Sequence, residues 1–239
     1  MNLLAQLPAL QIVVPMLTAP LVAFLRLPKL SWAATTAASA MAFAIAVSLT
    51  RAVLGGAGVE YAMGGWPAPY GIVLAIDQFS VLMLLIVTGS STMALLVGKA
   101  SLEREVEASR QPLFYAGWLL VMAGLSGIVV TGDAFNIFVF MEISSLATYM
   151  LVAGGPDRRA LTSVFKYLIM GTIGATFYLI GIGLVYMMTG TLNLADMETR
   201  IGEVTDLKPI LVAAGFITIG LALKAAVFPL HAWLPNAYT

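Results

Sequence analysis

Long apolar runs constrain the fold of this chain more than any other feature of its sequence. A helix rises about 1.5 Å per residue, so about 20 apolar residues cross the roughly 30 Å hydrocarbon core of a bilayer. Hydrophobic residues make up 60% of the chain and charged residues only 10%, against about 25% charged in soluble proteins. The sequence therefore predicts an all-α, polytopic transmembrane helix bundle of about seven spans. The predicted spans are Leu3–Leu25, Leu30–Leu49, Ile72–Val97, Leu113–Val130, Ala134–Ala153, Leu161–Met188 and Ile210–Leu230.

Several kinds of site are excluded by the polar residues that the chain lacks. It contains no cysteine, which rules out disulfides, thiolate-bound iron–sulfur clusters and cysteine zinc sites. The single histidine argues against a histidine metal centre, so we expect no metal ligands. A net charge of zero without a basic tract gives no reason to expect nucleic acid as a partner. No quinone, flavin or nicotinamide motif is visible, and we expect no cofactor and no catalytic residue.

Basic residues in the connecting segments predict how the chain lies in the membrane. Lysine and arginine accumulate in cytoplasmic loops of membrane proteins. The first, third and fifth connections carry most of them, and the opposite connections carry fewer. This bias predicts a multi-pass protein of the plasma (inner) membrane with its N-terminus outside. The first set is Arg26, Lys29, Lys99, Arg104, Arg110, Arg158 and Arg159, and the second is Arg51, Arg200 and Lys208.

Three polar interruptions separate the predicted spans. Gly55–Tyr70, with Trp66, is typical of an external loop with an aromatic residue at the membrane interface. Ser101–Gln111 carries charges of both signs and is interpreted as a solvated internal connector. Leu192–Lys208 alternates charged and apolar residues, which suits an amphipathic piece lying on the surface.

Two charges of opposite sign are predicted deep in the membrane. Glu142 lies about nine residues into the fifth span, roughly 14 Å at helical rise. Lys224 lies about 14 residues, or roughly 21 Å, from the outer end of the seventh. Five residues later, Pro229 lacks the N–H that a continuing helix needs and crowds the carbonyl of Ala225. We therefore expect a discontinuous seventh span with a charge beside its break.

A purely structural salt bridge is one interpretation of Glu142 and Lys224, although such pairs seldom add net stability over apolar packing. A proton relay is the stronger one, because burial disfavours a charged lysine while a nearby carboxylate favours it. Changing their separation would then load or release a proton. His231 could extend the path or simply lie at a helix end. Lys166 could take part or reach the headgroups from the sixth span.

Glycines in the sixth span predict a face that packs closely against another helix, in preference to a ligand-binding site. These are Gly171, Gly174, Gly181 and Gly183.

Three segments together resemble the antiporter-like membrane subunits shared by Mrp-type cation/proton antiporters and respiratory complex I. The form GDxFNxFVFxE at the start of the first segment is more similar to the D subunit of the Mrp antiporters than to the complex I subunits. The segments are TGDAFNIFVFMEISSLATYML (131–151), FKYLIMGTIGATFYLIGIGLVYMMTGTLNLADM (165–197) and LALKAAVFPLHAWLPNAYT (221–239).

This resemblance implies a proton-translocating module of two inverted five-helix repeats within about fourteen spans. By motif position, Glu142 and Lys224 correspond to the family's glutamate in the fifth span and lysine in the broken seventh. His231 and Pro235 match its HxWLPDA motif, with Asn236 where an aspartate is usual. Lys166 falls where several members carry a basic residue. The resemblance thus implies a proton-relay set of Glu142, Lys224, His231 and Lys166, with Pro229 and Pro235 as helix-break residues.

The chain is about half as long as members of the family. We interpret residues 1–239 as one transmembrane domain, with three spans and a connector in residues 1–111 and an incomplete first inverted repeat in 112–239. The expected function is that of the N-terminal half of a proton-translocating subunit in a multisubunit monovalent cation/proton antiporter. Its expected partners are other membrane subunits, protons or sodium, and the lipid bilayer.

Two alternatives stay open. The chain could be a membrane subunit of an NADH dehydrogenase-type complex, and it would then be a translocase without redox chemistry of its own. It could instead be a non-transporting structural anchor in such a complex. In either case a redox centre would belong to other subunits.

Overall fold

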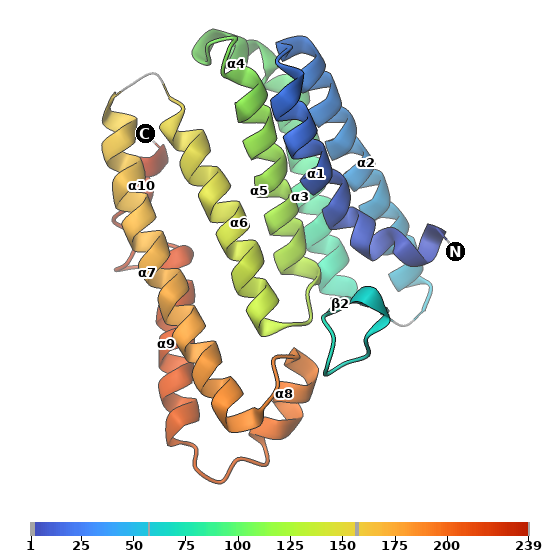
Figure 1. Ribbon diagram of the computed structural model, residues 1–239, viewed down its shortest axis with the longest axis vertical. Coiled ribbons are helices and arrows are strands. Elements are labelled where there is room, and N and C mark those ends of the chain that lie inside the picture. The colour runs from blue at the N-terminus through green and yellow to red at the C-terminus, as the bar shows by residue number, and fades with distance from the viewer. Residues whose placement is uncertain (1–2, 57, 156–157, 239) are drawn as a thin grey trace.

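The computed structural model describes residues 3–56, 58–155 and 158–238. Helices dominate the fold, and a short two-stranded sheet caps one end (Figure 1). The elements are α1 (Leu7–Leu25), α2 (Pro28–Leu54), β1 (Val59–Ala62), β2 (Val73–Ile76), α3 (Gln78–Val97), α4 (Lys99–Glu105), α5 (Gln111–Val130), α6 (Ala134–Ala153), α7 (Arg158–Thr189), α8 (Leu194–Ile201), α9 (Lys208–Lys224) and α10 (Leu234–Tyr238).

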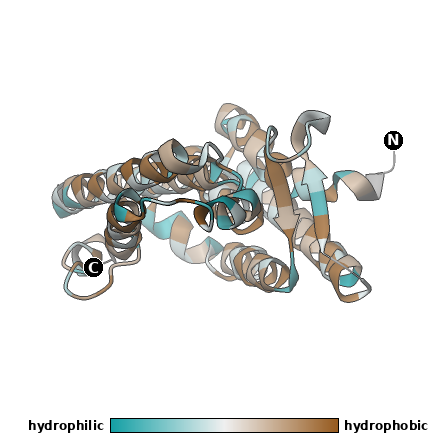
Figure 2. Ribbon diagram, turned by 90° about the horizontal axis from the view of Figure 1, so that it is seen from below, coloured by the Kyte–Doolittle hydropathy of each residue, from teal (hydrophilic) through white to brown (hydrophobic). Residues whose placement is uncertain are grey.

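Six described helices are long and apolar enough to cross a membrane, namely α1, α2, α3, α5, α6 and α7. Many large apolar side chains on them face outward, such as Phe24 with 82% of its surface exposed and Leu21 with 64%. Figure 2, seen from the sheet end, shows hydrophobic residues over most of the helical ribbon. The fold is therefore the predicted all-α polytopic membrane bundle.

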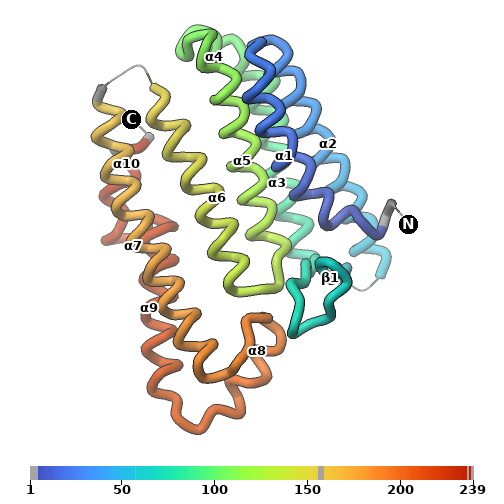
Figure 3. Tube along the Cα trace, viewed as in Figure 1, coloured from blue at the N-terminus to red at the C-terminus, as the bar shows by residue number. Residues whose placement is uncertain are grey.

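Two groups of helices are joined through α6. Helices α1, α2, α3 and α5 pack together, and α5 also packs along α6. On the other side of α6, α7 packs against both α6 and α9, as the left half of Figure 1 shows. The tube in Figure 3 shows β1 and α8 at one end of the molecule, with α4 and α10 toward the opposite end.

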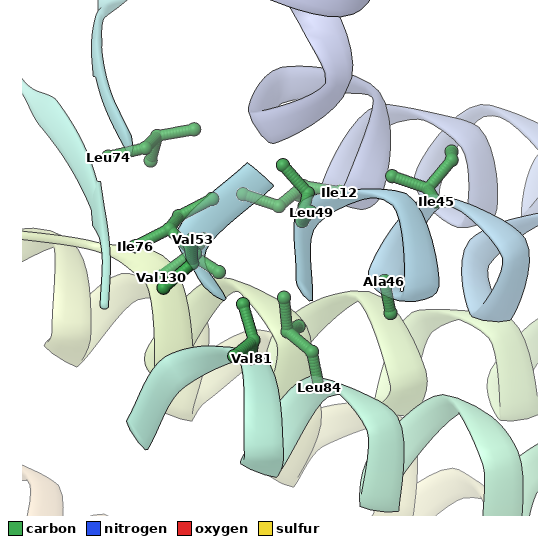
Figure 4. Close-up of a cluster of buried hydrophobic side chains, with 10 residues drawn as sticks. All are labelled: Ile12, Ile45, Ala46, Leu49, Val53, Leu74, Ile76, Val81, Leu84 and Val130. Atoms are coloured by element: carbon green, nitrogen blue, oxygen red, sulfur yellow. The ribbon is translucent and has the colours of Figure 1, made fainter. Parts of the chain in front are cut away.

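The segment before α3 is a strand and not part of a span, which corrects the predicted start at Ile72. Val73–Ile76 pairs antiparallel with Val59–Ala62, with Val59 opposite Ile76 and Ala62 opposite Val73. Leu74 and Ile76 are nearly fully buried. Figure 4 shows them packed over residues of α1, α2, α3 and α5, among them Ile12, Leu49, Leu84 and Val130. An apolar strand with a buried face has the same local composition as a span, so apolarity alone could not separate them.

The other predicted interruptions contain short elements. Lys99–Glu105 forms the short helix α4, and Leu194–Ile201 forms α8 within the predicted surface piece. The loop expected over Gly55–Tyr70 contains β1, and its Trp66 side chain is exposed.

The seventh predicted span is discontinuous, but its helix, the 17-residue α9, ends at Lys224 and not at Pro229. Ala226 adopts a left-handed backbone with φ of 51°. The Ala226 N–H bonds the Leu223 carbonyl at 3.3 Å, and the Val227 N–H bonds the Ala222 carbonyl at 2.9 Å. This pair of bonds is a Schellman motif, which ends a helix by satisfying its last carbonyls. The residue in the left-handed position is usually glycine, so an alanine there gave no sign of the earlier end.

Candidate proton-relay site

Glu142 and Lys224 meet where α6 passes the end of α9. The Lys224 Nζ lies 2.9 Å from the Glu142 Oε1, and the lysine and glutamate side chains are 14% and 24% exposed. Glu142 is the ninth residue of α6, whereas Lys224 is the last residue of α9. The structure thus brings together the two charges that the sequence predicted to be deep in the membrane.

A hydroxyl is a second hydrogen-bond acceptor for the lysine. Lys224 Nζ also donates to the Ser145 Oγ at 2.7 Å, and Ser145 is 8% exposed. Ser145 follows Glu142 by three residues, so both acceptors lie on one face of α6. Ser145 was not among the residues predicted from the sequence, although its spacing from Glu142 was a usable signal.

Hydrogen bonds to neighbouring segments hold the N-terminal end of α6, the helix that carries Glu142. Asp133 caps α6 by accepting the Asn136 N–H at 2.8 Å. The Ala134 N–H donates to the Leu192 carbonyl, and the Leu194 N–H to the Gly132 carbonyl, both at 2.9 Å. Burial raises the pKa of Asp133 above its ordinary value of 3.8, against the lowering effect of the N–H groups that it caps. This carboxyl therefore lies in a partly desolvated place where α6 begins.

Glycines let α9 approach α7 closely at several points along their contact. A Cβ added to Gly220 would lie 2.6 Å from the Gly174 carbonyl oxygen, and one added to Gly181 would lie 2.8 Å from the Ala213 carbonyl oxygen. The predicted packing role is confirmed for Gly171, Gly174 and Gly181, where an added Cβ would crowd a neighbouring helix. Within the described residues Gly183 makes no such contact, because an added Cβ there would meet nothing within 4 Å.

Aromatic side chains connect the end of α9 to α7 and α6. The buried Trp233 donates its Nε1–H to the Leu223 carbonyl at 3.0 Å, which satisfies one of the last carbonyls of α9. Its ring stacks on Tyr167 at 4.3 Å between centroids, and Tyr167 meets Tyr149 edge to face at 4.6 Å. Trp233 thereby holds the segment after the break against the bundle, a role that was not predicted from the sequence.

The other predicted relay residues lie apart from the pair's immediate contacts. Lys166 is exposed on α7, and the ion pairs of the described residues do not include it. His231 is exposed between α9 and α10, with its ring 5.4 Å from the Phe228 ring.

The predicted helix-break residues lie beyond the end of α9. Pro229 is in the irregular segment after α9, and Pro235 is in the first turn of α10. The side chains of Arg158 and Asn236 lie outside the described part of the structure.

The fold and the site together define a multi-pass membrane protein with an ion pair held between two of its helices. The family described as NADH:quinone oxidoreductase/Mrp antiporter, transmembrane, matches residues 131–239. This segment contains both charges of the pair and the break after α9.

Relatives of both kinds named in that description are similar to nearly the whole chain. The N subunit of the NADH-quinone oxidoreductase of Desulforudis audaxviator is 40% identical over 238 residues, which are 98% of this chain and 47% of that protein. The D subunit of the Na(+)/H(+) antiporter of Bacillus subtilis is 36% identical over 230 residues, which are 96% of this chain and 46% of the relative. The chain spans about half the length of the curated relatives it matches.

Solved structures agree with this relationship. A chain of the archaeal membrane-bound sulfane sulfur reductase, a respiratory membrane complex, superimposes with a TM-score of 0.89 at 31% identity, over 98% of this chain and 47% of that one. A chain of the Mrp complex from Dietzia gives a TM-score of 0.86 at 30% identity, over 100% of this chain and 44% of that one. The chain belongs to the family of antiporter-like membrane subunits that Mrp antiporters and respiratory complex I share.

Proposed function

We propose that this chain is half of a proton-translocating membrane subunit in which Glu142 and Lys224 act as a proton relay. The observation that supports this most is the 2.9 Å contact between the two charges at the end of an interrupted helix. A charge inside a membrane is costly, and such residues commonly mark ion pathways. A break beside the lysine leaves α9 with an end that can move without distorting a continuous helix.

The relay requires two arrangements of the pair. In the closed arrangement, the ionised Glu142 holds the protonated Lys224, because a nearby opposite charge favours the charged form. When the two separate, the desolvated ammonium loses that support and releases its proton. The proton moves toward the segment after the break, where His231 offers an imidazole, a group suited to proton exchange near neutral pH. Return of the lysine to Glu142 favours reprotonation.

Assembly with other membrane subunits is part of the proposal, because the chain covers less than half of each relative described above. The Mrp complex from Dietzia and the sulfane sulfur reductase are both complexes by their names. We place the chain in the plasma membrane with its N-terminus outside, in a monovalent cation/proton antiporter. The alternative assembly is a dehydrogenase-type complex, in which other subunits would carry the redox centres. Affinity purification from the native membrane, followed by identification of the accompanying subunits, separates these two assemblies.

Proton transport by vesicles that hold the intact complex tests the relay. We expect Lys224→Ala and Glu142→Gln each to reduce proton flux by at least about tenfold, while the complex still assembles. Lys208→Ala is the matched control, because Lys208 begins the same helix and lies outside the contacts of the pair. Wild-type flux in both relay variants, with normal assembly, would contradict the proposal.

A further inference from the structure

The lysine of the ion pair has a second hydrogen-bond acceptor, the uncharged hydroxyl of Ser145, which has no part in the relay described above. An ammonium group has three N–H donors and no acceptor. Lys224 directs one to the Glu142 Oε1 at 2.9 Å and one to the Ser145 Oγ at 2.7 Å. The shorter of the two contacts is therefore made to the neutral group.

Neighbouring hydroxyls on α6 behave differently. Serine and threonine inside a helix commonly donate to a carbonyl three or four residues earlier. Ser144 does so to the Met141 carbonyl at 2.9 Å, and Thr148 does so to the Ser144 carbonyl at 2.8 Å. Ser145 instead accepts a hydrogen bond from a residue 79 positions away. Its hydroxyl is thus turned out of the helix toward the lysine.

The groups that surround the ammonium make this acceptor important. From α6, the titratable Glu142 is bonded to the ammonium, and the hydroxyl of Tyr149, four residues after Ser145, is buried against Gly171 of α7. From α7, Gly174 faces the aliphatic part of Lys224 and offers no polar side chain. Lys166 and His231 are exposed. If Glu142 is taken away, Ser145 is the neighbouring side chain already bonded to the ammonium.

We propose that Ser145 is a positioning residue, which keeps the Lys224 ammonium in place while its contact with Glu142 opens and closes. A neutral hydroxyl accepts a hydrogen bond from the charged lysine without competing with it for a proton. Lys224 can then exchange its proton without leaving the face of α6 that carries Glu142. This inference rests on the proposed relay, but the placement of the lysine can be measured separately from transport.

The titration of Lys224 in the assembled complex provides that measurement. The ¹⁵N signal of its Nζ is followed against pH in Ser145→Ala and in the unaltered protein. Losing one hydrogen bond that favours the charged form should move the measured midpoint to lower pH. Ser144→Ala is the matched control, since Ser144 has the same 8% exposure and bonds within its own helix. Ser145→Thr retains the hydroxyl and should restore most of the original midpoint.

Transport provides the second readout. We expect the pH profile of proton flux to shift in the same direction in Ser145→Ala and to stay unchanged in Ser144→Ala. An unaltered Lys224 midpoint in Ser145→Ala, or an equal shift in Ser144→Ala, would overturn the positioning role. If transport survives Lys224→Ala, the relay fails, but the Nζ midpoint still decides whether Ser145 supports the charge of the lysine.

Discussion

At the residue scale, the charges of the site could be identified from the sequence better than their uncharged neighbours. Glu142 and Lys224 could be predicted because a charge inside an apolar run is conspicuous, and because both fall in recognisable motifs. Ser145 and Trp233 are ordinary residues in their surroundings. Ser145 is indicated only by its spacing of three residues from Glu142, and Trp233 only by its place in the HxWLPDA-like motif. Their contacts, with Lys224 79 positions away and with the Leu223 carbonyl, have no local sequence signal.

Asp77, which caps α3 at the end of the sheet, gives a testable prediction at the residue scale. Its Oδ1 accepts the Ser80 N–H at 2.7 Å and the Ser80 hydroxyl at 2.9 Å. The Ser80 backbone bond is the main cause that holds the pKa of Asp77 below its ordinary value of 3.8. Asp77→Ala should therefore lower the free energy of unfolding by about 1 kcal/mol at neutral pH.

The pH dependence of this effect has a definite sign. A carboxyl with a lowered pKa in the folded state stabilises it above its unfolded pKa, and this stabilisation is lost as pH falls through the folded value. The difference in free energy of unfolding between Asp77→Ala and the unaltered protein should thus have its full size above about pH 5 and should shrink below pH 3.8. Asp77→Asn keeps the cap but should lose this dependence. Unfolding in detergent, followed over that range, measures it, and a constant difference would contradict the assignment.

At the element scale, apolar length predicted the spans well and their ends less well. The span over Ala134–Ala153 has the predicted bounds, because Asp133 caps its N-terminus and Gly154 caps its C-terminus. The strand at Val73–Ile76 was absorbed into a span, and the end of α9 was placed at Leu230 in place of Lys224. The strand was missed because its hydrogen bonds with a distant segment leave no mark on the local composition. The end of α9 was missed because it depends on a left-handed alanine, which also leaves the composition unchanged.

Packing of α7 on α9 provides the prediction at this scale. Membrane helices associate closely through small residues, so bulk at the contact should separate them. Gly220→Ala places a methyl group against the Gly174 carbonyl and the Tyr178 backbone nitrogen, at 2.6 and 2.7 Å. Such overpacking should destabilise the protein by about 1–3 kcal/mol. Thermal unfolding of the purified complex measures the loss.

A control for this substitution exists in the same helix. Gly215 also belongs to α9, but a Cβ added there meets nothing within 4 Å. Gly215→Ala should therefore leave the melting temperature unchanged or raise it, because alanine favours helix more than glycine. Equal destabilisation by both substitutions would mean that the contact with α7 is not responsible.

At the scale of the whole molecule, the orientation in the membrane is the prediction that depends on loop charge alone. The chain has no native cysteine, so single cysteines can report it directly. Tyr70, 89% exposed beside the sheet, should lie outside, and the exposed Ser101 of α4 should lie inside. An impermeant maleimide added to intact cells should label Tyr70→Cys but label Ser101→Cys only after permeabilisation. The reverse pattern would invert the proposed topology.

The central claim is that the buried pair moves protons and is not only a packing device. Replacing both charges with apolar side chains separates these roles, because apolar residues can substitute for a buried ion pair without loss of stability. The deciding measurement is proton flux in vesicles that hold the intact complex with Glu142→Met and Lys224→Met combined. The relay predicts an assembled complex whose proton flux is abolished. Flux at the unaltered rate in that assembled complex would contradict it.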